Sequence, residues 1–133
     1  MQRPNKDENN FISILYAVGL KPLANWEITL KNGHVRRDKD ADIDTCAIEI
    51  IGANVNNNYI STPADPQASL NIKMPTLVMQ IKHLRKYFAF EVHILDSKKI
   101  KRQFRICNFQ VSAIIYTQYI LTVCNQLILI DYY

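Results

Sequence analysis

The hydrophobic pattern predicts a β-hairpin over residues 86–110. Apolar residues occupy every second position of 88–94, which is the period of a strand with one face in a core. They are Phe88, Phe90, Val92 and Ile94. Residues 96–99 read Asp-Ser-Lys-Lys, a polar turn, and a second apolar row follows. That row contains Ile100, Phe104 and Ile106. Arg102 interrupts it, so the return strand is expected to lie near an edge or to bend there.

The same alternation predicts further short strands between turns, and no long helical pattern occurs. These strands are 26–30, 34–37, 46–51, 59–61, 70–74 and 77–81, the last apolar on both faces like a central strand. Asn32-Gly33 is the strongest hairpin turn and predicts that 26–30 pairs with 34–37. The apolar segment 11–18 fits a buried strand or a short helix. Short strands with frequent turns predict an all-β sandwich or barrel.

Composition is that of one globular domain with a sizeable core, at 133 residues and 48% hydrophobic. The formal net charge of +4 favours acidic partners. The three cysteines form no CxxC pair and sit in apolar runs, which indicates free thiols in a reducing interior. They are Cys46, Cys107 and Cys124. Residues 1–10 are polar and predict a disordered leader without a signal peptide.

No pattern of catalytic or metal-binding residues is present. Cys46, His34 and Asp44 include a nucleophile, a base and a carboxylate, but no motif or spacing selects them. The loop 38–44 has aspartates at alternate positions like a calcium loop, yet lacks the glycine and the distal glutamate, so a solvated loop is favoured. We therefore predict no catalytic residue, no metal site and no cofactor.

Positive charge gathers on the return strand of the hairpin and its turn. The predicted basic surface consists of Lys98, Lys99, Lys101, Arg102 and Arg105, with Arg36 and Arg37 as a second cluster. Whether the two clusters adjoin depends on strand order. This surface would attract an acidic polymer. Charge alone favours a plainer interpretation, in which the lysines solvate the hairpin and protect a sheet edge.

Two other binding classes fit parts of the pattern. Nucleic acid suits the charge as well as an acidic protein does, although no aromatic RNP-type motif occurs. Trp26 and Tyr59 suit a glycan-stacking platform, although a lone tryptophan in an alternating strand is more often core. The alternatives to an acidic protein partner are therefore a nucleic-acid-binding or a glycan-binding module.

Long runs of the chain resemble the family of cilia- and flagella-associated protein twenty. They include FISILYAVGLKPLANWE, IEIIGANVNNNYISTPADP, MPTLVMQIKHLRKYFAFEVHILD and KKIKRQFRICNFQ, and they cover 11–110. The resemblance implies an antiparallel β-sandwich of jelly-roll type, like a carbohydrate-binding module, without enzymatic activity. It implies a structural protein of the axoneme and basal body that bridges tubulin and a neighbour, the parkin co-regulated protein, at the inner junction of doublet microtubules. It thereby implies support of axoneme stability and ciliary motility; a nuclear pool is a further expectation.

The segment 111–133 departs from that resemblance. Residues 111–130 carry no charge, glycine or proline. Val111-Ser112 can be encoded by a sequence of splice-donor form, and the residues that follow can be encoded by AT-rich codons. We therefore interpret the segment as intron read-through or a mis-joined gene model that leaves the sandwich incomplete at its C-terminus. A lineage-specific tail with replacement strands is the alternative. A membrane anchor is less favoured, because polar residues interrupt the apolar run.

Overall fold

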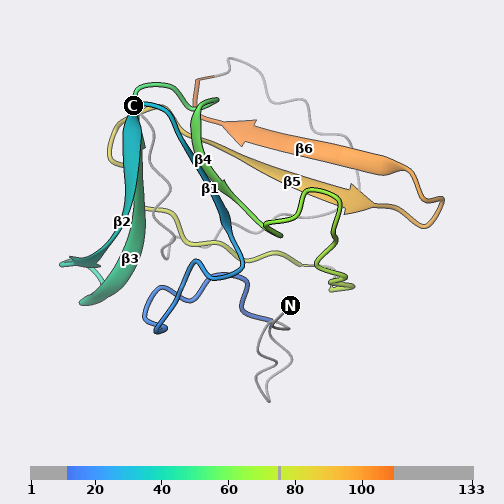
Figure 1. The fold of residues 1–133 in the computed structure, drawn as a ribbon, viewed down its shortest axis with the longest axis horizontal. Coiled ribbons are helices and arrows are strands. Elements are labelled where there is room, and N and C mark those ends of the chain that lie inside the picture. Colours follow the sequence, from blue (N-terminus) through green and yellow to red (C-terminus); the bar gives the residue numbers. More distant parts are fainter. Residues whose placement is uncertain (1–11, 75, 110–133) are drawn as a thin grey trace.

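The computed structural model describes residues 12–74 and 76–109, and its regular secondary structure is antiparallel β-sheet (Figure 1). The strands are β1 (Glu27–Leu30), β2 (Gly33–Asp40), β3 (Thr45–Gly52), β4 (Asn58–Ser61), β5 (Ala89–Leu95) and β6 (Lys101–Cys107). They form three two-stranded sheets, β1–β4, β2–β3 and β5–β6. No helix occurs within the two described ranges. The all-β prediction is therefore confirmed, while the β-sandwich of jelly-roll type, incomplete at its C-terminus, stays a prediction.

The core is centred on β3, where the β2–β3 sheet contacts the β1–β4 sheet. Ile48 and Ile50 are 2% and 0% exposed. The apolar side chains packed on them are Leu15, Ala17, Leu23, Val35, Val55, Ile60 and Phe88. In Figure 1 the β1–β4 pair lies between the β2–β3 hairpin and the β5–β6 hairpin. Burial of these aliphatic side chains is the main force that holds the pairs together.

The hairpin predicted over 86–110 is present as β5 and β6. Val92 faces Phe104 across the pair, and Phe90 faces Ile106, so the predicted apolar row is one face of the sheet. The turn is also confirmed, because the Lys99 amide donates to the carbonyl of Asp96 at 2.9 Å. Cross-strand register therefore follows the period-two pattern in this part of the chain.

The turn between β2 and β3 is shorter than the sequence predicts. β2 continues through Asp38 to Asp40, which the pattern placed in the charged loop 38–44, and only residues 41–44 form the turn. The reason is pairing, since Asp38 lies opposite Ala47 and Asp40 opposite Thr45 in the ladder. The predicted loop boundary is thus wrong by three residues.

Lys82 ties the chain before β5 to this turn. Its Nζ lies 2.5 Å from Oδ2 of both Asp40 and Asp42. The hydrogen bond from Lys82 lowers the pKa of Asp40, and the hydrogen bonds to Asp40 and Asp42 raise the pKa of Lys82. Asp40 and Asp42, two aspartates of the calcium-like loop, therefore form ion pairs with Lys82.

We expect Lys82→Met to lower the free energy of unfolding by its full amount between pH values near 4 and 10, and by progressively less outside this range. The lowered pKa of Asp40 makes its contribution present above the ordinary value of 3.8 and lost as pH falls through the folded value. The raised pKa of Lys82 makes its contribution present below 10.5 and lost as pH rises through the folded value. Urea unfolding of both proteins across pH measures this difference. A difference that persists unchanged at pH 2.5 would contradict the ion pair.

The predicted hairpin at Asn32-Gly33 does not form. β1 pairs with β4 and β2 pairs with β3, so the chain passes from one sheet to another at this dipeptide. The Oδ1 of Asn58 accepts the backbone N–H of Lys31 at 3.1 Å and of Asn32 at 3.2 Å. No glycine in the described residues has positive φ. Gly33 is needed instead for close approach, since a Cβ there would lie 2.0 Å from the carbonyl oxygen of Ile51.

Two further predicted strands, 70–74 and 77–81, are not strands. Asn71 has a φ of 54°, which breaks an extended chain, and only Ile81 forms a single bridge. Val78 is 55% exposed, so 77–81 is not buried on both faces. The described part of the segment 11–18 is neither helix nor extended strand. In the described part of the chain, the alternation along these segments is therefore not matched by a strand ladder, but only by isolated bridges.

The predicted strands 46–51 and 59–61 are confirmed within β3 and β4. The predicted strand 26–30 is confirmed except for Trp26, because β1 begins at Glu27. Cys46 and Cys107 are free thiols. The predicted leader 1–10, the tail 111–133 and Cys124 lie outside the described residues.

Candidate functional site

The polar face of the β5–β6 hairpin places Lys101 and Arg105 on one side of the sheet. Side chains at alternate positions of a strand share a face, and the ladder sets Lys101 opposite Leu95 and Arg105 opposite Glu91. Both cations are exposed. This pair is the part of the predicted basic surface that the structure brings onto one face.

Arg105 also contacts the loop after β3. Its Nη2 donates a hydrogen bond to Oδ1 of Asn56 at 2.9 Å, across a sequence separation of 49 residues. A guanidinium has five N–H donors, so this bond leaves donors for a second acceptor. Arg105 is therefore exposed, and its guanidinium is held in one orientation by the hydrogen bond to Asn56.

Glu91 lies within the same polar face and lowers its positive charge. Its Oε1 lies 2.7 Å from Nε2 of His93. Partial burial alone would raise the pKa of Glu91, but hydrogen bonds from His93 and Gln103 and the charge of Arg105 hold it below its ordinary value. Glu91 is thus ionised near neutral pH, and Lys101 is the cation of this face that lies farthest from it along the strand.

The turn of the hairpin is organised by Asp96. Its Oδ1 accepts the backbone N–H groups of Lys98 and Ile100 at 2.9 Å each, and its Oδ2 lies 2.9 Å from Nη2 of Arg102. The N–H of Ile100, followed by the Arg102 guanidinium, lowers the pKa of Asp96 despite some desolvation. A carboxylate that accepts several N–H groups stays ionised and holds the turn.

The structure separates Arg102 from the other cations of the hairpin. It lies opposite Ile94, on the face of the apolar row, and its charge is compensated by Asp96. Lys98 and Lys99 stand in the exposed turn, where Lys99 has a φ of 59°. The hairpin therefore presents Lys98, Lys99, Lys101 and Arg105 to a partner more directly than Arg102.

The second cluster, Arg36 and Arg37, belongs to the β2–β3 sheet and not to the sheet of the hairpin. The two side chains lie on opposite faces of β2. Arg36 forms an ion pair with Glu49 and lies 3.8 Å from Asp38, whereas Nη1 of Arg37 donates to the carbonyl of Gly19 at 2.7 Å. These two residues therefore do not extend the polar face of the hairpin through a shared sheet.

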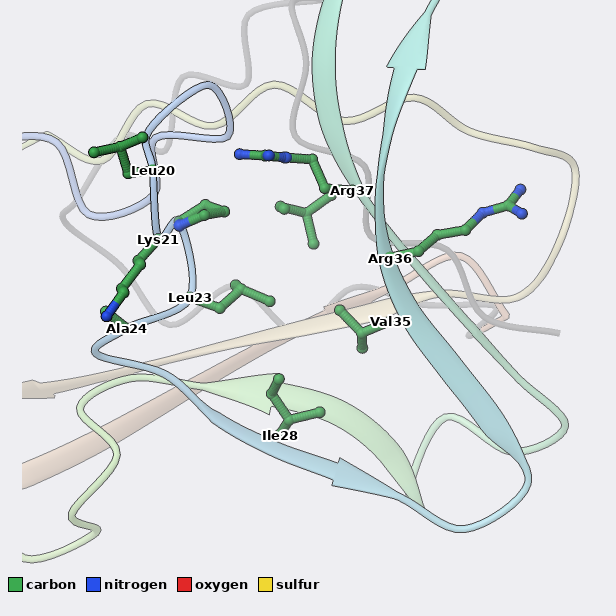
Figure 2. Close-up of a pocket in the computed structure, with 10 residues that line it drawn as sticks. Leu20, Lys21, Leu23, Ala24, Ile28, Val35, Arg36 and Arg37 are labelled. Atoms are coloured by element: carbon green, nitrogen blue, oxygen red, sulfur yellow. The ribbon is translucent and has the colours of Figure 1, made fainter.

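Sequence reasoning missed an open groove beside Arg37. It lies between the segment 20–24 and strands β1, β2 and β3, with a volume of about 360 Å³ (Figure 2). The alternation of β2 placed Val35 and Arg37 on one face, but nothing in the sequence brings 20–24 against that face. The groove is a second candidate binding site.

The residues considered for catalysis are not assembled. Within β2–β3, His34 lies opposite Ile51 and Cys46 opposite Lys39, five ladder positions apart, which corresponds to roughly 17 Å. In the residues that the structure describes, no group of three or more metal-ligating side chains is found. No helix in the described ranges is long and apolar enough to cross a membrane.

Trp26 does not stand as an open stacking platform. Its indole is half-buried, and Nε1 donates to the carbonyl of Ile14 at 3.3 Å. Tyr59, the other residue considered for a glycan, is 37% exposed on β4. A buried tryptophan with a satisfied N–H is typical of packing.

Comparison with known proteins identifies the family. The sequence model of the CFA20 domain matches residues 2–126, a wider range than the 11–110 resemblance. Proteins named cilia- and flagella-associated protein 20 are 51% identical in Paramecium tetraurelia, 49% in Chlamydomonas reinhardtii and 47% in Caenorhabditis briggsae, each over 106 residues. The alignments cover 80% of this chain and 56%, 56% and 52% of those relatives, so the chain spans about half their length. The chain belongs to the CFA20 domain family.

Proposed function

We propose that this chain is a non-enzymatic, structural microtubule-associated protein of cilia and flagella. The observation that carries the proposal is membership of the CFA20 domain family, with about half of the residues identical to proteins named as cilia- and flagella-associated. The proposed localisation is the ciliary or flagellar axoneme and basal body. The proposed role is support of axoneme stability and ciliary motility.

The mechanism that we propose is lateral bridging at the inner junction of doublet microtubules. The polar face of the β5–β6 hairpin, with Lys101 and Arg105 exposed on it, supports contact with the acidic tubulin surface. Another face would contact a neighbouring junction protein such as the parkin co-regulated protein. Individual contacts need only be weak, because a repeating lattice binds many copies at once.

A rigid two-stranded sheet suits such a contact. The hairpin turn is fixed by three hydrogen bonds and an ion pair at Asp96, so Lys98 and Lys101 are presented in a defined geometry. Pre-organised charges lose less entropy on binding than charges on a flexible loop. This geometry supports binding to an extended acidic surface and involves no small-molecule substrate.

The test is a direct comparison of two acidic polymers. The purified chain is pelleted with stabilised microtubules and, in parallel, captured on mixed-sequence RNA at the same ionic strength. We expect saturable microtubule binding that is tighter than RNA binding and that weakens with added salt, because exposed charges are screened. Tighter binding to RNA would replace the proposal with a nucleic-acid-binding module.

A further inference from the structure

The groove beside Arg37 combines an apolar floor with a cationic rim. Its floor is formed by Leu23, Ile28, Val35 and Ile48. Ile28 is 43% exposed and Leu20, at the outer wall, is fully exposed. Its volume of about 360 Å³ is that of a site for one large side chain and its neighbours. The groove therefore offers solvent-exposed apolar surface.

The charge of the groove is of one sign. Lys21 and Arg37 come from its two walls, and no carboxylate is among its lining residues. Figure 2 shows the guanidinium of Arg37 turned toward the segment 20–24, whereas the side chain of Arg36, a residue that also lines the groove, extends away from it on the other side of β2. Arg36 is compensated by Glu49, but the described part of the chain holds no carboxylate paired with Arg37.

The guanidinium of Arg37 is held by one hydrogen bond, and its other N–H donors can bind a ligand. Its Nη1 donates to the carbonyl of Gly19 at 2.7 Å, and that bond fixes the guanidinium at the rim. The remaining N–H groups form the planar fork that binds a carboxylate with two hydrogen bonds. The stem of Arg37 lies opposite Ile48 in the ladder, beside the apolar floor. An anion bound here would thus lie directly next to an apolar pocket.

We propose that this groove binds an acidic polypeptide segment that carries one aliphatic side chain. The aliphatic side chain enters between Leu23, Ile28 and Val35, and flanking carboxylates reach Arg37 and Lys21. Charge complementarity selects acidic flanks, and burial of the anchor supplies most of the affinity. The groove is lined by the segment 20–24 and by β1, β2 and β3, and not by the β5–β6 hairpin, so peptide binding can be measured without microtubules.

The experiment uses fluorescein-labelled peptides and fluorescence polarisation at low salt, without microtubules. The probe is Glu-Glu-Leu-Glu-Glu, and the comparison peptide has alanine in place of leucine. We expect the alanine peptide to bind about fiftyfold more weakly, because roughly three buried methylene equivalents are lost. Arg37→Gln should weaken binding of the leucine peptide about fivefold, as for a partly exposed charge pair.

Arg85→Gln is the matched control, since it makes the same charge change at an exposed arginine that does not line the groove. It should change the affinity less than twofold. Absence of binding, equal affinity for both peptides, or an equal loss with Arg85→Gln would each overturn the proposal. If a variant fails to fold, methyl NMR of the unaltered chain decides. Peptide-induced shifts at Leu23, Ile28 and Val35 support the groove, and shifts confined to β5–β6 overturn it.

Discussion

Replacing Asn58 with alanine is expected to lower the free energy of unfolding by about 3 to 5 kcal/mol. Asn58 is 1% exposed, and its Oδ1 accepts the N–H groups of Lys31 and Asn32. Its Nδ2 donates to the carbonyl of Asn54 at 2.9 Å. Alanine would leave the two N–H groups without their acceptor and would open a hole, while the Asn54 carbonyl would keep the bond from the Asn57 N–H at 3.1 Å. Each orphaned buried polar group costs about 1 to 3 kcal/mol.

The surroundings of Asn58 leave little room for repair. A Cβ at Gly52 would lie 2.3 Å from Cγ of Asn58, so backbone already packs directly on the amide. The measurement is urea unfolding followed by circular dichroism. Asn57→Ala is the matched control, because its side chain makes none of these bonds, and it should change stability by less than about 1 kcal/mol. Equal effects of the two variants would show that the hydrogen bonds of the Asn58 amide to Lys31, Asn32 and Asn54 do not stabilise the fold.

The variant Lys101→Glu with Arg105→Gln is expected to weaken microtubule binding more than tenfold at low salt. It removes three units of positive charge from one face of the hairpin. Glutamine at 105 avoids placing two carboxylates opposite each other, since Arg105 faces Glu91 across the ladder. The effect should shrink at physiological salt, because exposed charges are then screened within about 8 Å.

The matched control is Lys31→Glu with Lys73→Gln. It makes the same change in net charge at exposed positions outside the hairpin. Co-sedimentation over a series of tubulin concentrations gives both affinities. An equal loss in the two variants would mean that binding depends on total charge alone, and no loss in the hairpin variant would remove this face from the proposal.

Sequence patterns predicted strands well where local and long-range signals agree. In β5 and β6 the alternation, the polar turn and the register all coincide, and Val92 meets Phe104 as expected. The family resemblance was also readable from long runs of residues. Local consistency of this kind is what makes a hairpin recognisable without a structure.

The predictions failed where a distant residue decides the outcome. Asn32-Gly33 has the composition of a hairpin turn, but Asn58, 26 residues further along the chain, accepts its backbone N–H and leads the chain into another sheet. Residues 70–74 alternate, yet Asn71 turns the backbone and no ladder partner is present in the described ranges. Likewise, charge alone placed Arg36 and Arg37 in one basic cluster. The structure distinguishes them, because Arg36 forms an ion pair with Glu49.

The hydrogen bond between Arg105 and Asn56 would couple binding at the hairpin to the loop between β3 and β4. An acidic partner that takes more of the Arg105 guanidinium competes with Asn56 for it. Asn56 lies two residues from Asn58, on the loop that enters β4. Loss of one exposed hydrogen bond costs only about 1 kcal/mol, so the exchange is cheap. Binding of the proposed acidic partner to the hairpin would then loosen this loop. The β1–β4 sheet would therefore respond to binding through the side chain of Arg105.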